Sequence, residues 1–186
     1  MPFLTTDFPG LVVFEPAVFT DDRGYFFESY NEQFFFKQGL DMRFVQDNQS
    51  FSRYGVVRGL HYQLDPHAQT KLVRVLQGKI LDVVLDLRQG SPSFGKSMRI
   101  ELSADNKKQL LIPRGFAHGF SVLSETADVL YKCDAFYDKA SEGGILFSDP
   151  ALGIDWGLPE DKIVVSAKDL ELPLLAACRN NFQFSR

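Results

Sequence analysis

Three residues of this sequence have the chemistry that a proton-transfer site needs, and each lies in a segment that alternates like a β-strand. His61 occurs in RGLHYQ, Lys71 opens KLVRV, and Tyr131 lies in VLYKC. Histidine titrates near neutral pH and can act as a base, an ammonium can stabilise an oxyanion, and a neutral phenol can donate a proton. Each also has a structural explanation: a hydrogen-bonded core histidine, a solvated lysine at a strand end, and a packed tyrosine. Residue type alone leaves this choice open.

Three further polar residues, Asp169, Arg23 and His118, each have a structural explanation. Asp169 ends SAKD, which is typical of a helix start with a serine cap and an acid in the third position, so Asp169 could serve the helix alone. Arg23, in DDRG, indicates an exposed turn. His118 lies in a strand flanked by glycines at positions 115 and 119, which indicates either close approach to a ligand or a tight turn.

A metal site is disfavoured by the histidine spacing. No two of His61, His67 and His118 are separated by two or four positions, whereas zinc and non-haem iron sites need two or three such ligands with a carboxylate. Cys133 and Cys178 form neither a CxxC pair nor a disulfide framework. We therefore expect no catalytic metal, and the absence of GxGxxG after a strand disfavours a nicotinamide cofactor.

Composition excludes several other classes of protein. The 186 residues carry a net charge of −4 and no long basic tract, so nucleic acid is not an expected partner. The first ten residues lack the basic and apolar regions of a signal peptide, and the apolar runs are too short for a membrane span. We expect a cytoplasmic protein with no membrane contact. The 18 Phe, 6 Tyr and 1 Trp predict a large core in a single domain over residues 1–186.

Alternating patterns predict many short strands and few helices. One helix is expected after Asn31 and ends at Gly39, and another runs from Ser166 to Leu170. No βαβ rhythm occurs, so the sequence predicts an all-β sandwich or barrel whose edges could pair across a dimer. The expected strands are 12–14, 24–29, 44–49, 55–64, 71–77, 79–88, 98–102, 116–122 and 129–137.

Taken together, these segments resemble the dTDP-4-dehydrorhamnose 3,5-epimerases, metal-free members of the cupin superfamily. The resemblance implies an all-β jelly roll of the cupin type with a few short peripheral helices. Its motifs follow one another over nearly the whole chain: FEP at 14–16, DRGYFFE at 22–28, QDN at 46–48, VRGLHYQ at 57–63, KLVR at 71–74, DLR at 86–88, SPSFG at 91–95, residues 112–120, YK at 131–132, DPALGIDW at 149–156 and SAKD at 166–169.

The resemblance implies catalytic roles for four residues. His61 would be the general base, paired with Asp169. Lys71 would steady the enolate oxygen, and Tyr131 would be the general acid on the opposite face. The residues implied in substrate binding are Arg23, Phe26, Glu28, Gln46, Asn48, Arg58, His118, Tyr137, Glu142 and Lys168.

The resemblance also implies a substrate and a partner. The reaction would convert dTDP-4-keto-6-deoxy-D-glucose to dTDP-4-keto-L-rhamnose, a step of dTDP-L-rhamnose biosynthesis, by inverting C3 and C5 without a cofactor. Arg23 and Arg58 would meet the phosphates, and Tyr137 would stack on thymine. The family forms homodimers in which Arg23 reaches the site of the second subunit. Epimerisation of one carbon only, a sugar-binding module without catalysis, and a metal-dependent cupin are the alternatives.

Overall fold

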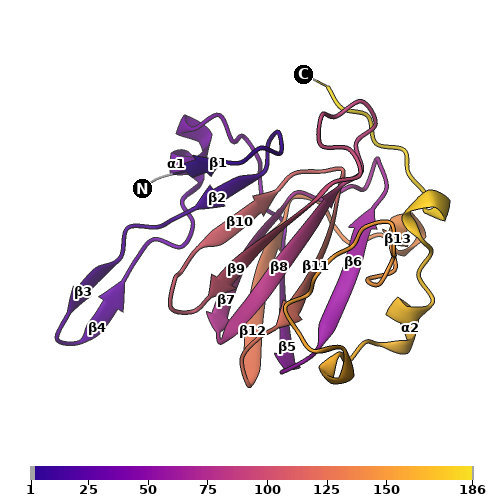
Figure 1. Cartoon of the computed structure of the whole chain (residues 1–186). Coiled ribbons are helices and arrows are strands. Elements are labelled where there is room, and N and C mark those ends of the chain that lie inside the picture. Colours follow the sequence, from indigo (N-terminus) through magenta and orange to yellow (C-terminus); the bar gives the residue numbers. More distant parts are fainter. Residues whose placement is uncertain (1–2, 186) are drawn as a thin grey trace.

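The computed structural model describes residues 3–185, which form two facing antiparallel sheets and one separate hairpin (Figure 1). The six-stranded sheet has the order β1 (Phe3–Thr5), β2 (Val12–Phe14), β10 (Gln109–Ile112), β7 (Lys71–Gln77), β12 (Thr126–Cys133) and β5 (Gln46–Arg53). The five-stranded sheet has the order β13 (Glu142–Gly144), β6 (Val57–Gln63), β11 (Phe116–Val122), β8 (Lys79–Asp86) and β9 (Ser97–Ser103).

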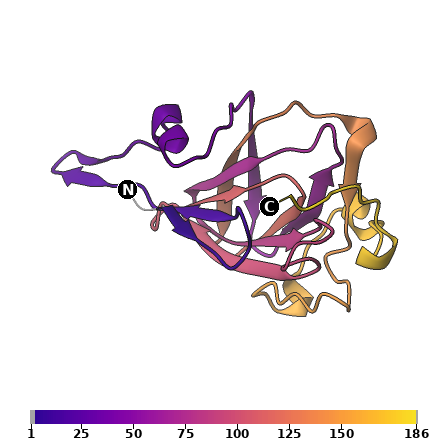
Figure 2. The same ribbon diagram turned by 90° about the horizontal axis from the view of Figure 1, so that it is seen from above.

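The chain crosses repeatedly between the two sheets. The strand pairs β5–β6, β7–β8 and β11–β12 are consecutive in sequence, yet their members lie in opposite sheets. Viewed from above, the two sheets curve around a common interior (Figure 2). The predicted all-β jelly roll is therefore confirmed.

Helices are short and peripheral, as predicted. Helix α1 (Glu32–Lys37) begins after Asn31, whose side chain accepts a hydrogen bond from the Phe34 N–H, and α2 (Ala167–Leu170) begins after Ser166. Three single-turn 3₁₀ helices complete the set: Lys139–Ser141, Glu160–Lys162 and Leu175–Ala177. No helix among residues 3–185 is long and apolar enough to cross a bilayer.

Strand β8 contributes apolar side chains to two separate cores, one on each of its faces. Ile80 and Val84 face the interior between the sheets, and Val83 and Leu85 on the other face pack with Trp156 in a second core. Both faces of this strand are thus buried, because the C-terminal part of the chain covers the outside of the five-stranded sheet. A third cluster lies under α1, where Phe14 and Phe35 are both 1% exposed.

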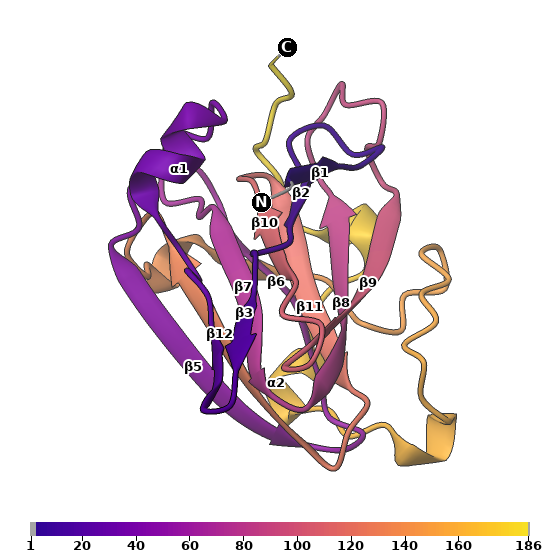
Figure 3. The ribbon, with the colours of Figure 1, turned by 90° about the vertical axis from the view of Figure 1, so that its left-hand side faces the viewer.

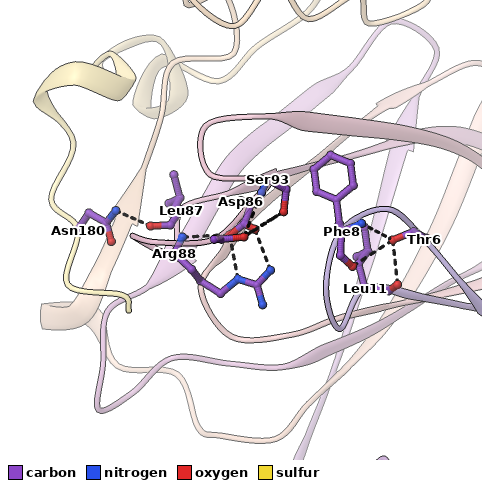
Figure 4. Close-up of polar contacts among 9 residues, drawn as sticks. Thr6, Phe8, Leu11, Asp86, Leu87, Arg88, Ser93 and Asn180 are labelled. Carbon is purple, nitrogen blue, oxygen red and sulfur yellow. Dashed lines mark hydrogen bonds and ion pairs between the residues drawn. The ribbon is translucent and has the colours of Figure 1, made fainter. Parts of the chain in front are cut away.

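A buried ion pair organises the end of β8 and the chain that follows it. Arg88 donates from Nε and Nη2 to the Asp86 carboxylate at 2.9 and 2.8 Å, and the Ser93 hydroxyl donates to the same carboxylate at 2.7 Å (Figure 4). Asn180 donates to the Leu87 carbonyl at 2.6 Å and so ties the C-terminal segment to this corner. Burial alone would raise the pKa of Asp86, but these hydrogen bonds lower it.

Several predicted strand ends are wrong. The strand expected over 129–137 starts at Thr126 and ends at Cys133, and that expected over 44–49 spans Gln46–Arg53. The strand expected over 24–29 stops at Phe26, because it pairs only with β3 (Phe19–Asp21) in a two-stranded hairpin. Four strands, β1, β3, β10 and β13, were not predicted: three have only three residues, and β10 (QLLI) has three consecutive apolar residues and no alternation.

The hairpin of β3 and β4 (Gly24–Phe26) projects away from both sheets (Figures 1 and 2), and in Figure 3 it points toward the viewer in front of them. Its aromatic side chains Phe19, Tyr25 and Phe26 are 66%, 61% and 67% exposed. Exposed aromatic residues gathered on one projecting element are typical of an interaction surface.

Candidate active site

A β-bulge in β6 determines which of its side chains enter the interior. His118 of β11 pairs with His61, but Phe120, two residues further, pairs with Arg58, so β6 contains one extra residue at this point. Without it, Arg58 and His61 would lie on opposite faces, because strand side chains alternate. The bulge brings both to the interior face, while Leu60 and Tyr62 pack outward as predicted.

His61 is paired with Asp169 of α2. His61 Nε2 lies 2.8 Å from Asp169 Oδ1, and the Gly59 N–H donates to Asp169 Oδ2 at 3.1 Å. Only glycine fits at position 59: its φ is +108°, and an added Cβ would lie 2.7 Å from both Gly119 Cα and the His118 carbonyl oxygen. The close approach of these backbones therefore presents an N–H to the same carboxylate that holds the histidine.

The helix-capping interpretation of Asp169 and its pairing with His61 are compatible. The Asp169 N–H donates to the Ser166 hydroxyl at 3.1 Å, while the carboxylate points to His61. Burial would raise the pKa of Asp169, but the hydrogen bond and charge of His61 and the Gly59 N–H lower it. The carboxylate is thus ionised at neutral pH and orients the imidazole.

Lys71 and Tyr131 lie across the cavity from His61, on the other sheet. The Lys71 Nζ is 5.9 Å from the centroid of the Tyr131 ring, and both residues line the same pocket of about 390 Å³ as His61. Because β6 belongs to one sheet and β7 and β12 to the other, His61 and Tyr131 face a molecule in this pocket from opposite sides. The full lining is Gln46, Asn48, His61, Tyr62, Gln63, Gln69, Lys71, Tyr131, Tyr137 and Glu142.

The surroundings shift the pKa values of both groups. Burial lowers the pKa of Lys71, and the charges of Cys133 and Asp82 offset this only in part. Burial also raises the pKa of Tyr131, opposed by the charge of Arg58, so the phenol is neutral at pH 7. The cavity therefore presents one ammonium with a lowered pKa and one phenol with a raised pKa.

A second histidine–carboxylate pair lies deeper in the interior, and sequence reasoning assigned no role to its carboxylate. His118 Nε2 is 2.9 Å from Asp82 Oδ2, and both residues are buried. Among residues 3–185, Asp82 Oδ1 has no hydrogen-bond partner, and burial raises the pKa of Asp82 against the charges of His118 and Lys71. The signal was present in the sequence: Asp82 shares the interior face of β8 with Ile80 and Val84.

Glu142, Lys168 and Tyr137 form a polar cluster at the mouth of the pocket. Lys168 Nζ lies 2.8 Å from Glu142 Oε1, and the Tyr137 hydroxyl donates to Glu142 Oε2 at 3.3 Å. Lys168 also lines a smaller adjoining pocket with His61. Three predicted binding residues thus lie together beside the His61–Asp169 pair.

The remaining predicted binding residues fall into two groups. Gln46 donates to Asn48 at 3.0 Å, and Arg58 donates to Ser52 at 2.9 Å, so these side chains extend the polar wall formed by β5. Residues Arg23, Phe26 and Glu28, by contrast, lie on or just after the projecting hairpin, exposed to solvent and outside the pocket lining. One copy of the chain does not bring them to His61.

Two other observations bear on what the pocket can hold. Within residues 3–185, no three His, Cys, Asp or Glu side chains are grouped so that they could bind a metal ion. A larger groove of about 890 Å³, beneath Trp156 and Leu170, contains none of the proton-transfer residues. The predicted proton-transfer residues His61, Lys71 and Tyr131 therefore lie together in the smaller, more polar cavity between the sheets.

Fold and site together define a cupin-type jelly roll whose cavity holds the groups of an acid–base isomerase. The family model described as dTDP-4-dehydrorhamnose 3,5-epimerase matches residues 5–177, and this chain belongs to that family.

Curated and solved relatives agree with this assignment. A dTDP-4-dehydrorhamnose 3,5-epimerase of Pseudomonas aeruginosa is 53% identical over 87% of this chain and 88% of its own. The crystal structure of such an epimerase from Elizabethkingia anophelis has a TM-score of 0.90 at 52% identity, covering 95% of this chain and 97% of that one. A Legionella pneumophila epimerase in complex with dTDP-4-keto-L-rhamnose also has a TM-score of 0.90, at 46% identity and coverages of 95% and 93%.

Proposed function

We propose that this protein is a cofactor-independent isomerase that inverts C3 and C5 of dTDP-4-keto-6-deoxy-D-glucose to give dTDP-4-keto-L-rhamnose. The observation that carries the proposal is the placement of His61 and Tyr131 on opposite sheets across one pocket, with Lys71 beside Tyr131. Both carbons neighbour the C4 ketone, so their protons are acidified. Each inversion needs a base on one face and an acid on the other.

His61 acts as the base at each carbon. Its Nε2 is held by the Asp169 carboxylate, so Nδ1 accepts the substrate proton and Asp169 stabilises the imidazolium that forms. Proton loss leaves an enolate with its negative charge on the C4 oxygen. A carboxylate that fixes the tautomer and orientation of the imidazole is what this step requires.

Lys71 stabilises the enolate oxygen, and Tyr131 completes the inversion. One hydrogen-bond donor to a developing oxyanion is typically worth about 10²–10³ in rate. The Tyr131 hydroxyl then gives its proton to the carbon from the opposite face, and the ketone re-forms. His61 then releases its proton to solvent and the Tyr131 phenolate takes one up from solvent, so both residues are restored and the reaction involves no net oxidation or reduction.

The nucleotide is held at the mouth of the pocket. Arg58 suits a diphosphate, because its planar guanidinium binds phosphate oxygens in pairs. Tyr137, with Glu142 and Lys168 beside it, suits the base and the sugar. His118, Gln46 and Asn48 supply polar groups along the interior wall.

We further propose that the protein works as a homodimer in the cytoplasm. Arg23, Phe26 and Glu28 lie on or beside a projecting hairpin with exposed aromatic side chains, too remote to act in their own pocket. A second copy could receive this hairpin and gain Arg23 for the diphosphate. Each site would then be complete only in the dimer.

The product's configuration tests the proposal. The protein is incubated with dTDP-4-keto-6-deoxy-D-glucose, the 4-ketone is trapped by hydride reduction, and the sugar is assigned by proton NMR. Inversion at both carbons is the expected result. Inversion at one carbon would identify a single-carbon epimerase, and tight binding without inversion would identify a sugar-binding module.

A further inference from the structure

We propose that Gln63 is a positioning residue that fixes loop 134–138, and with it the Tyr137 ring, as a preformed platform for the nucleobase of the substrate. This inference rests on the proposed function, because the platform has a role only if the ligand carries a base. It concerns a side chain that sequence reasoning assigned no role.

Gln63 uses its side-chain amide on the backbone of two loops. Its Nε2 donates to the His67 carbonyl at 2.6 Å and to the Phe136 carbonyl at 3.3 Å, and its Oε1 accepts from the Asp138 N–H at 2.8 Å. The residue is only 6% exposed. Both amide hydrogens are engaged, so Gln63 is suited to hold the protein rather than the substrate.

Two other glutamines hold the same loop from different elements. Gln46 of β5 accepts from the Tyr137 N–H at 3.0 Å, and Gln69, just before β7, donates to the Ala135 carbonyl at 2.8 Å. One backbone group of each residue from 135 to 138 is therefore bonded to a glutamine side chain. Strand β12 ends at Cys133, so these groups lack the ladder partners that a longer strand would provide.

This arrangement holds Tyr137 at both ends. Its backbone N–H is bonded to Gln46, the residues on either side of it are bonded to Gln63, and its hydroxyl donates to Glu142 at 3.3 Å. The ring remains 55% exposed, so it is fixed in direction yet free to stack on a ligand. A ring that is ordered before binding spares the ligand the entropy of ordering it, which increases affinity.

The proposed role of Gln63 differs from that of His61, which lies on the same strand. His61 acts on the sugar carbons, whereas Gln63 acts through a loop that lies against the nucleotide. Loss of the Gln63 bonds should therefore weaken nucleotide binding and leave the chemical step intact.

The test compares Gln63→Met and Gln63→Glu with the matched control Gln49→Met, which alters an exposed glutamine whose side chain bonds, within residues 3–185, only to Asp128. Calorimetry measures the Kd of dTDP, and steady-state kinetics compares the nucleotide substrate with 4-keto-6-deoxy-D-glucose 1-phosphate, which lacks the base. For both Gln63 variants we expect the Kd of dTDP and the KM of the nucleotide substrate to rise about tenfold, the scale of one stacked base. We expect unchanged kcat, unchanged kcat/KM for the sugar phosphate, and no effect of Gln49→Met.

A double-mutant cycle shows whether Gln63 acts through the ring. If it does, Gln63→Met adds no further loss of dTDP affinity in a Tyr137→Ala background. An unchanged Kd of dTDP in folded Gln63→Glu would overturn the inference, and so would an equal fall in kcat with both substrates. If the unaltered protein binds dTDP but does not turn over the nucleotide sugar, the proposed function fails, and the Kd comparison still tests the platform.

Discussion

His61 Nε2 and Asp169 Oδ1 lie 2.8 Å apart although 108 positions separate the two residues in the chain. A strand of the barrel wall supplies the imidazole, and a four-residue helix beyond the last strand supplies the carboxylate. The same carboxylate also receives the N–H of Gly59. The carboxylate that orients the base is therefore itself held by a backbone hydrogen bond from the strand that carries His61.

Asp169→Asn should lower kcat by about 10²–10⁴-fold, because the amide keeps the shape of the side chain but cannot stabilise an imidazolium. Ser166→Ala is the matched control: it removes the helix cap and about 1 kcal/mol of stability while the carboxylate remains. Steady-state kinetics and thermal unfolding separate the two effects. Equal losses of kcat in both variants would indicate that Asp169 serves only the helix.

Lys71 should set the alkaline limit of activity. Burial lowers its pKa below the ordinary 10.5, so kcat/KM should fall as the pH rises through this lowered value and the ammonium loses its charge. Burial raises the pKa of Tyr131, so its phenol is still protonated in that range. In Lys71→Arg the guanidinium stays charged, and the alkaline limb should move upward although kcat is lower. The assignment of the alkaline limit to Lys71 would be contradicted if the alkaline limb of the kcat/KM profile kept its position in Lys71→Arg, or if it disappeared in Tyr131→Phe.

Tyr131→Phe should separate proton removal from proton return. Formation of inverted product should fall by about 10²-fold or more, because the donor on the opposite face is lost. Exchange of solvent deuterium into recovered substrate should persist, since His61 still removes and returns a proton on its own face. NMR of the recovered substrate and of the product measures both rates in one reaction. Equal loss of the two would assign Tyr131 a role other than proton donor.

Asp86→Asn should destabilise the fold by about 3–5 kcal/mol, because it leaves the buried Arg88 without its charge partner. The folded-state pKa of Asp86 is lowered, so the stabilisation is complete above the unfolded pKa of about 3.9 and is lost as the pH falls toward the folded value. Urea unfolding at pH 7 and pH 3 should show that the difference in free energy of unfolding between the unaltered protein and Asp86→Asn is smaller at pH 3. We expect each protein to unfold in one transition, as a single domain does. The surface pair of Asp47 and Lys132 is the control, and Asp47→Asn should cost less than about 1 kcal/mol. A difference independent of pH would contradict this account of Asp86.

Local patterns predicted much of this molecule, and their failures have physical causes. The parity of His61 against Leu60 and Tyr62, and the caps at Asn31 and Ser166, depend only on near neighbours in the chain. These predictions were therefore confirmed.

The bulge in β6 depends on a distant strand instead. The extra residue is visible only in the pairing of β6 with β11, where His118 pairs with His61 and Phe120 pairs with Arg58. A period-two pattern in the sequence of β6 contains no information about this pairing. Parity alone would have placed Arg58 opposite His61. The loop after Cys133 was likewise beyond prediction, because the glutamines that hold it come from three separate segments.

The most direct test of the account is solvent exchange with dTDP-4-keto-6-deoxy-D-glucose in D₂O, read by NMR separately at C3 and C5. The unaltered protein and a variant of the exposed His67, His67→Ala, should place deuterium at both carbons, and His61→Ala at neither, because one base serves both positions. Exchange that survives at either carbon in His61→Ala, or is absent at both in the unaltered protein, would contradict the central claim that His61 removes both protons.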